Sequence, residues 1–147
     1  MKRKVLLAVS PLVLGAAALV AQGRPAAPAG NATQAAPVRV QMKQVGARYV
    51  FEPSHFTIKV GDVVEFVTVS GFPHNIQFEP TKIPAGAAEV LNRNMPNRMG
   101  PLASPMLTAP NQTYRISFAG APVGTYDFFC LPHKALGMTG QITVRAR

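Results

Sequence analysis

Apolar residues recur at every second position in several short runs between Val38 and Ala146, and this alternation constrains the fold more than any other feature. The runs are Val38, Val40 and Met42; Phe56, Ile58 and Val60; Tyr114, Ile116 and Phe118; and Ile142, Val144 and Ala146. A period of two is typical of strands with one buried face. The β-branched and aromatic runs DVVEFVTVS (62–70), HNIQFE (74–79) and TYDFFC (125–130) predict further strands, with glycine-containing turns between them. The pattern predicts an all-β sandwich of seven or eight short strands.

The segment from Pro84 to Pro110 departs from this pattern. It holds five prolines and supports at most one short helix, around Ala87 to Leu91. A long irregular insert in a compact domain is often functional. The simpler interpretation is a flap over one open side of the sandwich, with apolar residues that pack beneath it. The candidate packing residues are Val90, Leu91, Leu102 and Leu107.

The N-terminal residues have the pattern of an export signal. Lys2-Arg3-Lys4 precede the mostly apolar run VLLAVSPLVLGAAALVA (5–21), and small residues follow it. We therefore predict a signal peptide over residues 1–23 and a periplasmic or extracellular protein. The alternative is a membrane anchor through residues 5–21, because 17 residues reach the lower limit for a membrane-spanning helix.

Residues 24–37, RPAAPAGNATQAAP, are rich in Ala and Pro and lack apolar periodicity. Such a composition is typical of a semi-rigid linker that does not pack. The folded domain is therefore predicted to span residues 38–147.

The chain is basic, with 15 Lys and Arg residues against 6 Asp and Glu residues and a formal net charge of +9. The positive excess persists without the three basic residues of the predicted signal. The basic residues occur singly, without an arginine-rich run or nucleic-acid-binding motif, which argues against nucleic acid as a partner. The charge instead favours a protein partner with an acidic docking surface, or association with an anionic membrane surface.

The stretch CLPHKALGM (130–138) contains Cys130, the only cysteine of the chain, followed by His133 and Met138. A single cysteine cannot form an internal disulfide, which is the usual role of cysteine in exported domains. A thiolate and an imidazole suit zinc, copper or iron, whereas a methionine sulfur is not among the usual zinc ligands and favours copper. One Cys and two His with a weak axial Met form a blue-copper site.

The second histidine of such a site must be His55 or His74. Phe56 and Ile58 occupy the core face of their predicted strand, so the alternation turns His55 towards water. His74 follows a Gly- and Pro-containing turn and can point out of one end of the sandwich, where the 130–138 loop is also expected. Ordinary packing of a buried cysteine and a methionine is the alternative, but the spacing of His133 and Met138 from Cys130 favours a metal site.

The pattern Cys130-x-x-His133-x4-Met138, with His74-Asn75 upstream, resembles the copper-binding pattern of the plastocyanin family of cupredoxins, which includes pseudoazurin-like proteins. The resemblance spans about residues 38–147 and includes VGDVVEFV before His74 and IPAG after it. It implies a Greek-key β-sandwich that holds one type 1 copper ion, with His74, Cys130, His133 and Met138 as ligands. It also implies that Asn75 ties the two ligand loops together by hydrogen bonds, and that the edge of His133 emerges through an apolar patch. The insert sequence NRNMPNRMGPLASPML does not match plastocyanin itself, which leaves the partner surface open.

The resemblance implies a monomeric one-electron carrier between redox partners, and no enzyme activity. A protein that stores copper or delivers it to an acceptor is the alternative, because the insert offers Met95, Met99 and Met106 as soft ligands, although core packing explains these more simply. A multicopper oxidase or copper nitrite reductase needs more than the three histidines present. A cysteine hydrolase would need a histidine base, and His133 lies too close to Cys130 along an extended loop.

Overall fold

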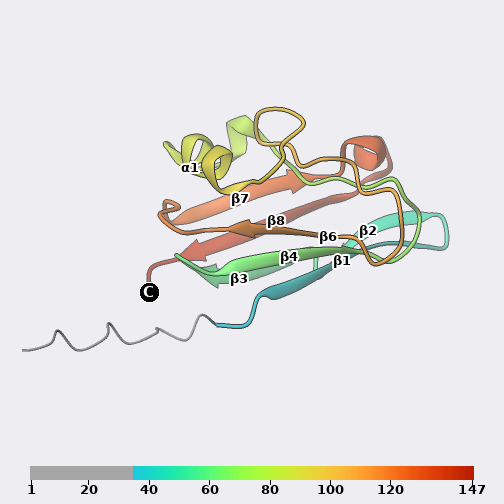
Figure 1. Cartoon of the computed structure of the whole chain (residues 1–147), viewed down its shortest axis with the longest axis horizontal. Helices are drawn as coiled ribbons and strands as arrows, with labels where there is room; N and C mark the ends of the chain where they lie inside the picture. The colour runs from blue at the N-terminus through green and yellow to red at the C-terminus, as the bar shows by residue number, and fades with distance from the viewer. Residues whose placement is uncertain (1–34) are drawn as a thin grey trace, which may run out of the picture. The chain divides into compact units, whose positions relative to one another are not determined.

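A computed structural model of the chain describes residues 35–147, which form two four-stranded sheets (Figure 1). One sheet has the strand order β2-β1-β4-β6 and the other β3-β8-β7-β5. The strands are β1 (Val38–Val45), β2 (Arg48–Glu52), β3 (His55–Lys59), β4 (Val63–Thr68), β5 (Gln77–Phe78), β6 (Thr113–Ser117), β7 (Gly124–Phe129) and β8 (Thr139–Arg145). The predicted all-β sandwich is confirmed.

The chain alternates between the two sheets from β2 to β7, which is why each sheet contains strands that are distant in sequence. β1 pairs with β4, and β3 with β8, in parallel. The remaining pairs, including β1 with β2 and β7 with β8, are antiparallel. These connections carry the ends of β4 and β7, and the loops that follow them, to one end of the sandwich.

The inner faces of the two sheets meet in a core rich in aromatic side chains. Phe128 of β7 contacts Phe51, Phe66 and Phe78 at ring-centroid distances of 4.8, 5.6 and 6.2 Å, mostly edge to face. Such pairs contribute beyond the apolar area that they bury. Strands from both sheets are thereby locked together directly before Cys130, so the end of β7 is held rigidly.

The predicted alternation of buried residues is largely confirmed, with three differences. Ala146 lies beyond β8 and is exposed. Only Gln77 and Phe78 of the predicted strand 74–79 form a strand, because residues 74–77 pair irregularly with the insert. Strand β2 was not predicted, because its half-buried Tyr49 and Val50 are adjacent and weaken the alternation.

The short 3₁₀ helix η1 (Pro80–Lys82) precedes the insert, which forms the helix α1 (Ala87–Asn94) and an irregular strap. The helix confirms the prediction around Ala87 to Leu91 and continues for three further residues. The predicted packing residues Val90, Leu91, Leu102 and Leu107 are all buried. Backbone hydrogen bonds join the strap to residues 74–78, including Phe78 N–H to the Leu102 carbonyl at 3.0 Å. The insert therefore packs as a flap along the segment that begins at His74.

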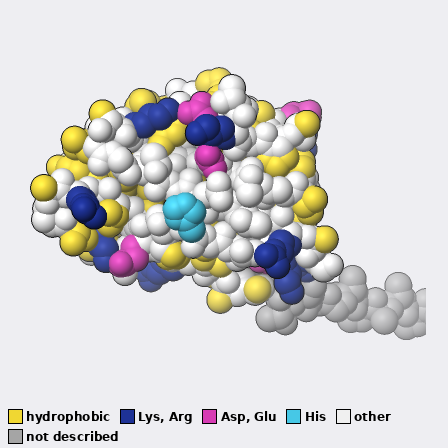
Figure 2. Space-filling view, turned by 180° about the vertical axis from the view of Figure 1, so that it is seen from behind, with side chains coloured by type: hydrophobic (Ala, Val, Ile, Leu, Met, Phe, Trp, Pro, Cys, Tyr) yellow, Lys and Arg dark blue, Asp and Glu magenta, His cyan; other side chains and the backbone are white. Residues whose placement is uncertain are grey.

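One end of the sandwich gathers the β1–β2 hairpin and the helical turn that follows β7, whereas the C-terminus lies at the other end (Figure 1). On the face shown in Figure 2, basic and acidic side chains lie next to each other in several places. Within the described residues, no helix has the length and apolarity needed to cross a membrane. The predicted signal (1–23) and most of the predicted linker (24–37) lie outside the described residues.

Candidate metal centre

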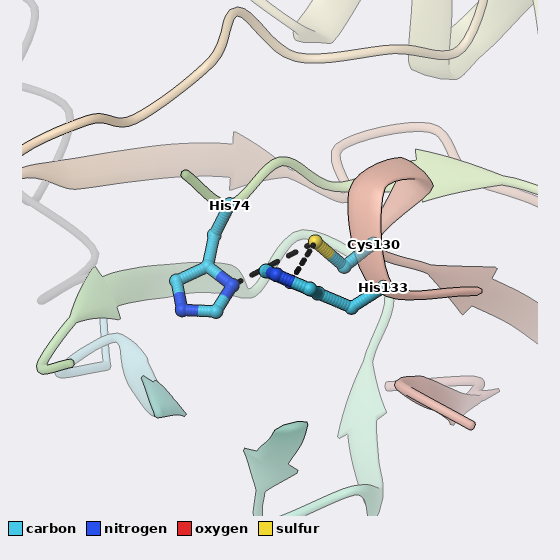
Figure 3. A group of neighbouring side chains, drawn as sticks. All are labelled: His74, Cys130 and His133. Atoms are coloured by element: carbon cyan, nitrogen blue, oxygen red, sulfur yellow. Dashed lines mark hydrogen bonds between the residues drawn. The ribbon is translucent and has the colours of Figure 1, made fainter. Parts of the chain in front are cut away.

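Three predicted ligand side chains meet at the end of the sandwich where β4 and β7 terminate (Figure 3). One donor atom from each of His74, Cys130 and His133 lies within 4.8 Å of the other two. The Cys130 sulfur is 3.7 Å from Nδ1 of His74 and 3.4 Å from Nδ1 of His133. His74 and Cys130 are fully buried, and His133 is 8% exposed.

The fourth predicted ligand, Met138, is fully buried in the same loop as Cys130 and His133. His55 lies apart, on β3, where it is exposed and its Nδ1 is 3.1 Å from the Ser54 hydroxyl. The prediction that His55 faces water is confirmed.

Backbone hydrogen bonds close the loop that carries Cys130, His133 and Met138. The 3₁₀ helix η2 (Leu131–Leu136) begins directly after Cys130 and is capped at its C-terminal end by Gly137, which adopts φ 82°. That left-handed conformation suits glycine. The Cys130 N–H donates to the Met138 carbonyl, and the Met138 N–H donates to the His133 carbonyl, each at 3.1 Å. The three residues therefore belong to one closed turn.

His74 is held from two sides. Its backbone forms a two-way bridge with Leu107 of the insert, with N–H to carbonyl distances of 3.0 and 2.8 Å. Its ring Nε2 lies 2.8 Å from the Ser70 carbonyl, an acceptor only, so Nε2 carries the proton and donates it. Nδ1 is then the free lone pair that faces Cys130. Sequence reasoning did not predict the Ser70 carbonyl or Leu107 as supports, because both act through the backbone.

Asn75 links the two ligand loops, as the resemblance implied. Its side-chain Oδ1 accepts a hydrogen bond from the Leu131 N–H at 2.7 Å. Its Nδ2 is buried and has no hydrogen-bond partner among the described residues. The bond joins the residue after His74 to the residue after Cys130, so it holds these two predicted ligands at a set separation.

Tyr49 of β2 completes the surroundings of the cluster. Its ring stacks on the His133 imidazole with a centroid distance of 3.7 Å and an interplanar angle of 9°. It also meets the His74 ring edge to face at 6.4 Å. Sequence reasoning missed Tyr49 because β2 was not identified. The available signal was the aromatic and β-branched run RYVFE directly after the turn at Gly46.

Burial sets the protonation states of the three donor side chains. It raises the pKa of the Cys130 thiol, and hydrogen bonds from the Asn75 and His133 backbones oppose that shift only in part. Burial also lowers the pKa of His74 and, together with the nearby His74, that of His133. Without a metal, the cluster is therefore a thiol and two neutral imidazoles, whose lone pairs are available. A bound cation would supply the charge that stabilises the thiolate, with release of a proton.

The donor set fits a copper ion. Metal distances of about 2.3 Å to sulfur and about 2.0 Å to nitrogen, the values known from zinc sites, place the two donor atoms about 3.5–3.7 Å apart at tetrahedral to trigonal angles. The observed separations of 3.4 and 3.7 Å are close to that range. One thiolate and two imidazoles are the strong ligands of a blue-copper site.

A family model described as copper binding proteins of the plastocyanin/azurin family matches residues 38–145. The chain belongs to this family. Plastocyanin from Scenedesmus fuscus is 41% identical to this chain over 109 residues, which cover 74% of this chain and 99% of that protein. Chloroplastic plastocyanin from Pisum sativum is 36% identical over 127 residues, or 86% of this chain and 68% of that protein. The solved structure of oxidized plastocyanin from Dryopteris crassirhizoma is similar with a TM-score of 0.55 and 31% identity, over 74% of this chain and 100% of that one.

As a member of the plastocyanin/azurin family, the protein is a blue copper electron carrier that exchanges electrons with redox partners. Its cofactor is copper, and the cluster of His74, Cys130 and His133 can hold one ion. The alternative of copper storage or delivery is not favoured. Of the insert methionines proposed for it, Met95 is buried in the core as packing predicted, whereas Met99 is 55% exposed and does not pack there.

Proposed function

We propose that His74, Cys130, His133 and Met138 are the four ligands of the copper ion, with Met138 as the weak axial ligand. The convergence of three buried donor atoms within 4.8 Å carries this proposal. Met138 is included because it is fully buried and its backbone hydrogen-bonds to both other ligands of its loop. Copper, when bound, would supply the one-electron couple Cu(I)/Cu(II), so that an electron taken from a reduced partner is passed to an oxidised one while no covalent bond of the protein is made or broken.

The protein's own contribution is to hold the ligands still. The Ser70 carbonyl fixes the His74 ring, the closed turn fixes Cys130 and His133, and Asn75 joins the two loops. Ligands that are supported in this way cannot relax towards the different geometries that the two copper oxidation states prefer. Little rearrangement then accompanies electron transfer, which makes transfer fast.

The electron is proposed to enter and leave at the partly exposed edge of His133. The side chains around this edge come from both ligand loops and are mostly apolar. Phe72, Pro73, Pro132, Ala135 and Leu136 are exposed there, with Gly71 partly buried and Gly137 exposed. Such a patch can dock against a partner without strong desolvation cost. The other two strong ligands have no exposed surface, so no substrate reaches them, and the protein acts as a carrier rather than as an enzyme.

The proposed partners are redox proteins with an acidic docking surface. Each of the six Asp and Glu residues lies within 4.0 Å of a basic group in the described part of the chain, including Glu79 with Lys134 and Asp127 with Lys82. The described basic residues outside these salt bridges are Arg48, Lys59, Arg98 and Arg145. The net field is therefore positive, which steers acidic partners and weakens as salt is added. Association with an anionic membrane surface is the second use that this charge allows.

The proposed setting is outside the cytoplasm, in the periplasm or extracellular space, as a monomer of domain 38–147 with residues 1–23 as signal and 24–37 as linker. The basic and apolar pattern of residues 2–21 supports this setting. The mass of the mature protein in the exported fraction tests it, because a retained anchor through residues 5–21 leaves the N-terminus uncut.

Ligand substitution with a matched histidine control tests the copper assignment. We expect Cys130→Ser to lose the intense visible absorption of the copper–thiolate bond, and His74→Ala to weaken it severely. Met138→Gln should stay blue with a shifted reduction potential, because the axial ligand tunes the site without dominating binding. His55→Ala, the control, should change neither absorption nor potential. A blue Cys130→Ser protein would refute the assignment.

A further inference from the structure

The two imidazoles of the cluster are held in different ways. The His74 ring donates its Nε2 proton to the Ser70 carbonyl at 2.8 Å. A metal-binding histidine usually makes such a second hydrogen bond, which fixes the orientation of its ring. For His133, the hydrogen-bond contact of the ring within the described residues is that of Nδ1 with the Cys130 sulfur. The orientation of the His133 ring therefore needs another support.

Tyr49 is in position to provide it. The stack of Tyr49 on His133, at 3.7 Å and 9°, is the closest and most nearly parallel aromatic pair among the described residues. The phenol ring is itself confined, because its Cε1 lies against Gly71, where an added Cβ would be only 3.0 Å away. The ring covers one face of the imidazole and prevents it from tilting towards that side.

We propose that Tyr49 is the positioning residue of His133, and that the stacked ring replaces the hydrogen bond that orients the other histidine. This inference rests on the proposed role of His133 as a copper ligand. The ring has a second consequence, because it keeps water from one face of the imidazole. The oxidised site carries more positive charge than the reduced site, so exclusion of water favours the reduced state and raises the reduction potential.

Two substitutions separate the ring from the hydroxyl. Tyr49→Phe keeps the ring, and Tyr49→Leu keeps an apolar side chain without a ring, with Tyr49→Met as a second ring-free variant should the first fold poorly. In the copper-free protein, NMR measures the ring protons of both histidines. We expect Tyr49→Leu to move the His133 signals downfield through loss of the ring current, while Tyr49→Phe preserves them. The His74 signals, supported by the Ser70 carbonyl, act as the internal control.

In the copper-loaded proteins, we expect Tyr49→Leu to release copper about tenfold faster, which is typical of losing a residue that orients a ligand. Its reduction potential should fall and its visible band should shift, while Tyr49→Phe stays close to wild type in both. Unchanged copper release, potential and His133 signals in Tyr49→Leu would overturn the proposal. A colourless wild-type protein would refute the ligand assignment instead, and the copper-free NMR comparison would still decide whether Tyr49 stacks on His133.

Discussion

Gly71 combines a constrained backbone conformation with close packing against Tyr49, the residue that stacks on His133. It lies in the loop before His74 with φ 71°, a conformation that side-chain-bearing residues rarely adopt. A Cβ at this position would lie 2.7 Å from the Gln44 Cβ and 3.0 Å from the Tyr49 Cε1. We therefore predict that Gly71→Ala both destabilises the protein and disturbs the ring that stacks on His133.

The magnitude follows from two separable costs. The left-handed backbone costs an alanine roughly 1–2 kcal/mol. The contact with the Gln44 Cβ cannot be relieved by rotating a flexible side-chain end, and overpacking of this kind costs roughly 1–3 kcal/mol. Gly46 isolates the first cost, because it has φ 60° and nothing within 4 Å of an added Cβ. Gly46→Ala should therefore cost roughly 1–2 kcal/mol, and Gly71→Ala roughly 2–5 kcal/mol.

Urea unfolding of the copper-free variants measures the loss in free energy of unfolding for Gly46→Ala and Gly71→Ala. The comparison holds if the slope of this free energy against urea concentration is the same as in wild type. The visible spectrum and reduction potential of the copper-loaded proteins then show whether the damage reaches the metal centre. We expect a shift for Gly71→Ala and none for Gly46→Ala. Equal unfolding free energies for the two variants would refute the steric part of the reasoning, and an unshifted spectrum for Gly71→Ala would refute the link to Tyr49.

Three further predictions concern the core and the cofactor. Tyr126→Phe loses a 2.6 Å hydrogen bond to a backbone carbonyl and should be about 1 kcal/mol less stable at pH 8. Burial raises the pKa of Tyr126 to about 12, so the folded state holds more protons than the unfolded state above pH 10. The free energy of unfolding of the wild type should then fall by about 1.4 kcal/mol by pH 11 because of this group. Urea titrations of wild type and Tyr126→Phe measure this, and a difference between the two proteins that stays constant from pH 8 to 11 would contradict it. Gly140→Ala places a Cβ 2.4 Å from the Phe128 Cζ and 2.7 Å from the Ser54 carbonyl oxygen. It should lower the free energy of unfolding by about 1–3 kcal/mol or more. Gly100→Ala, where an added Cβ meets open space, should be nearly neutral in the same urea assay. Removal of copper should lower the midpoint of thermal unfolding. Free copper at about 1,000 times its dissociation constant raises the free energy of unfolding by about 4 kcal/mol. Equal calorimetric midpoints with and without chelator would argue against a tightly held ion.

The sequence was sufficient to predict the sandwich, the short helix and the three side chains, His74, Cys130 and His133, that the fold brings together. Strand alternation depends on a local period of two, which survives in the sequence wherever one face of a strand is buried. The run from Cys130 to Met138 is equally local, because Cys130, His133 and Met138 belong to a single hydrogen-bonded turn. The choice of His74 over His55 also followed from alternation, since His55 precedes Phe56 on a strand whose core face was evident.

Only the tertiary structure decided how those donors are held. The His74 side chain and backbone are held by the Ser70 carbonyl and the Leu107 bridge, which lie 4 and 33 residues away in sequence. The His133 ring is stacked on Tyr49, 84 residues away. A backbone carbonyl has no residue-specific signature, and an aromatic residue on an edge strand looks the same whether it packs in the core or on an imidazole. Residue types determine which atoms can bind a metal, whereas the directions in which those atoms point depend on contacts between segments that become neighbours only when the two sheets pack together.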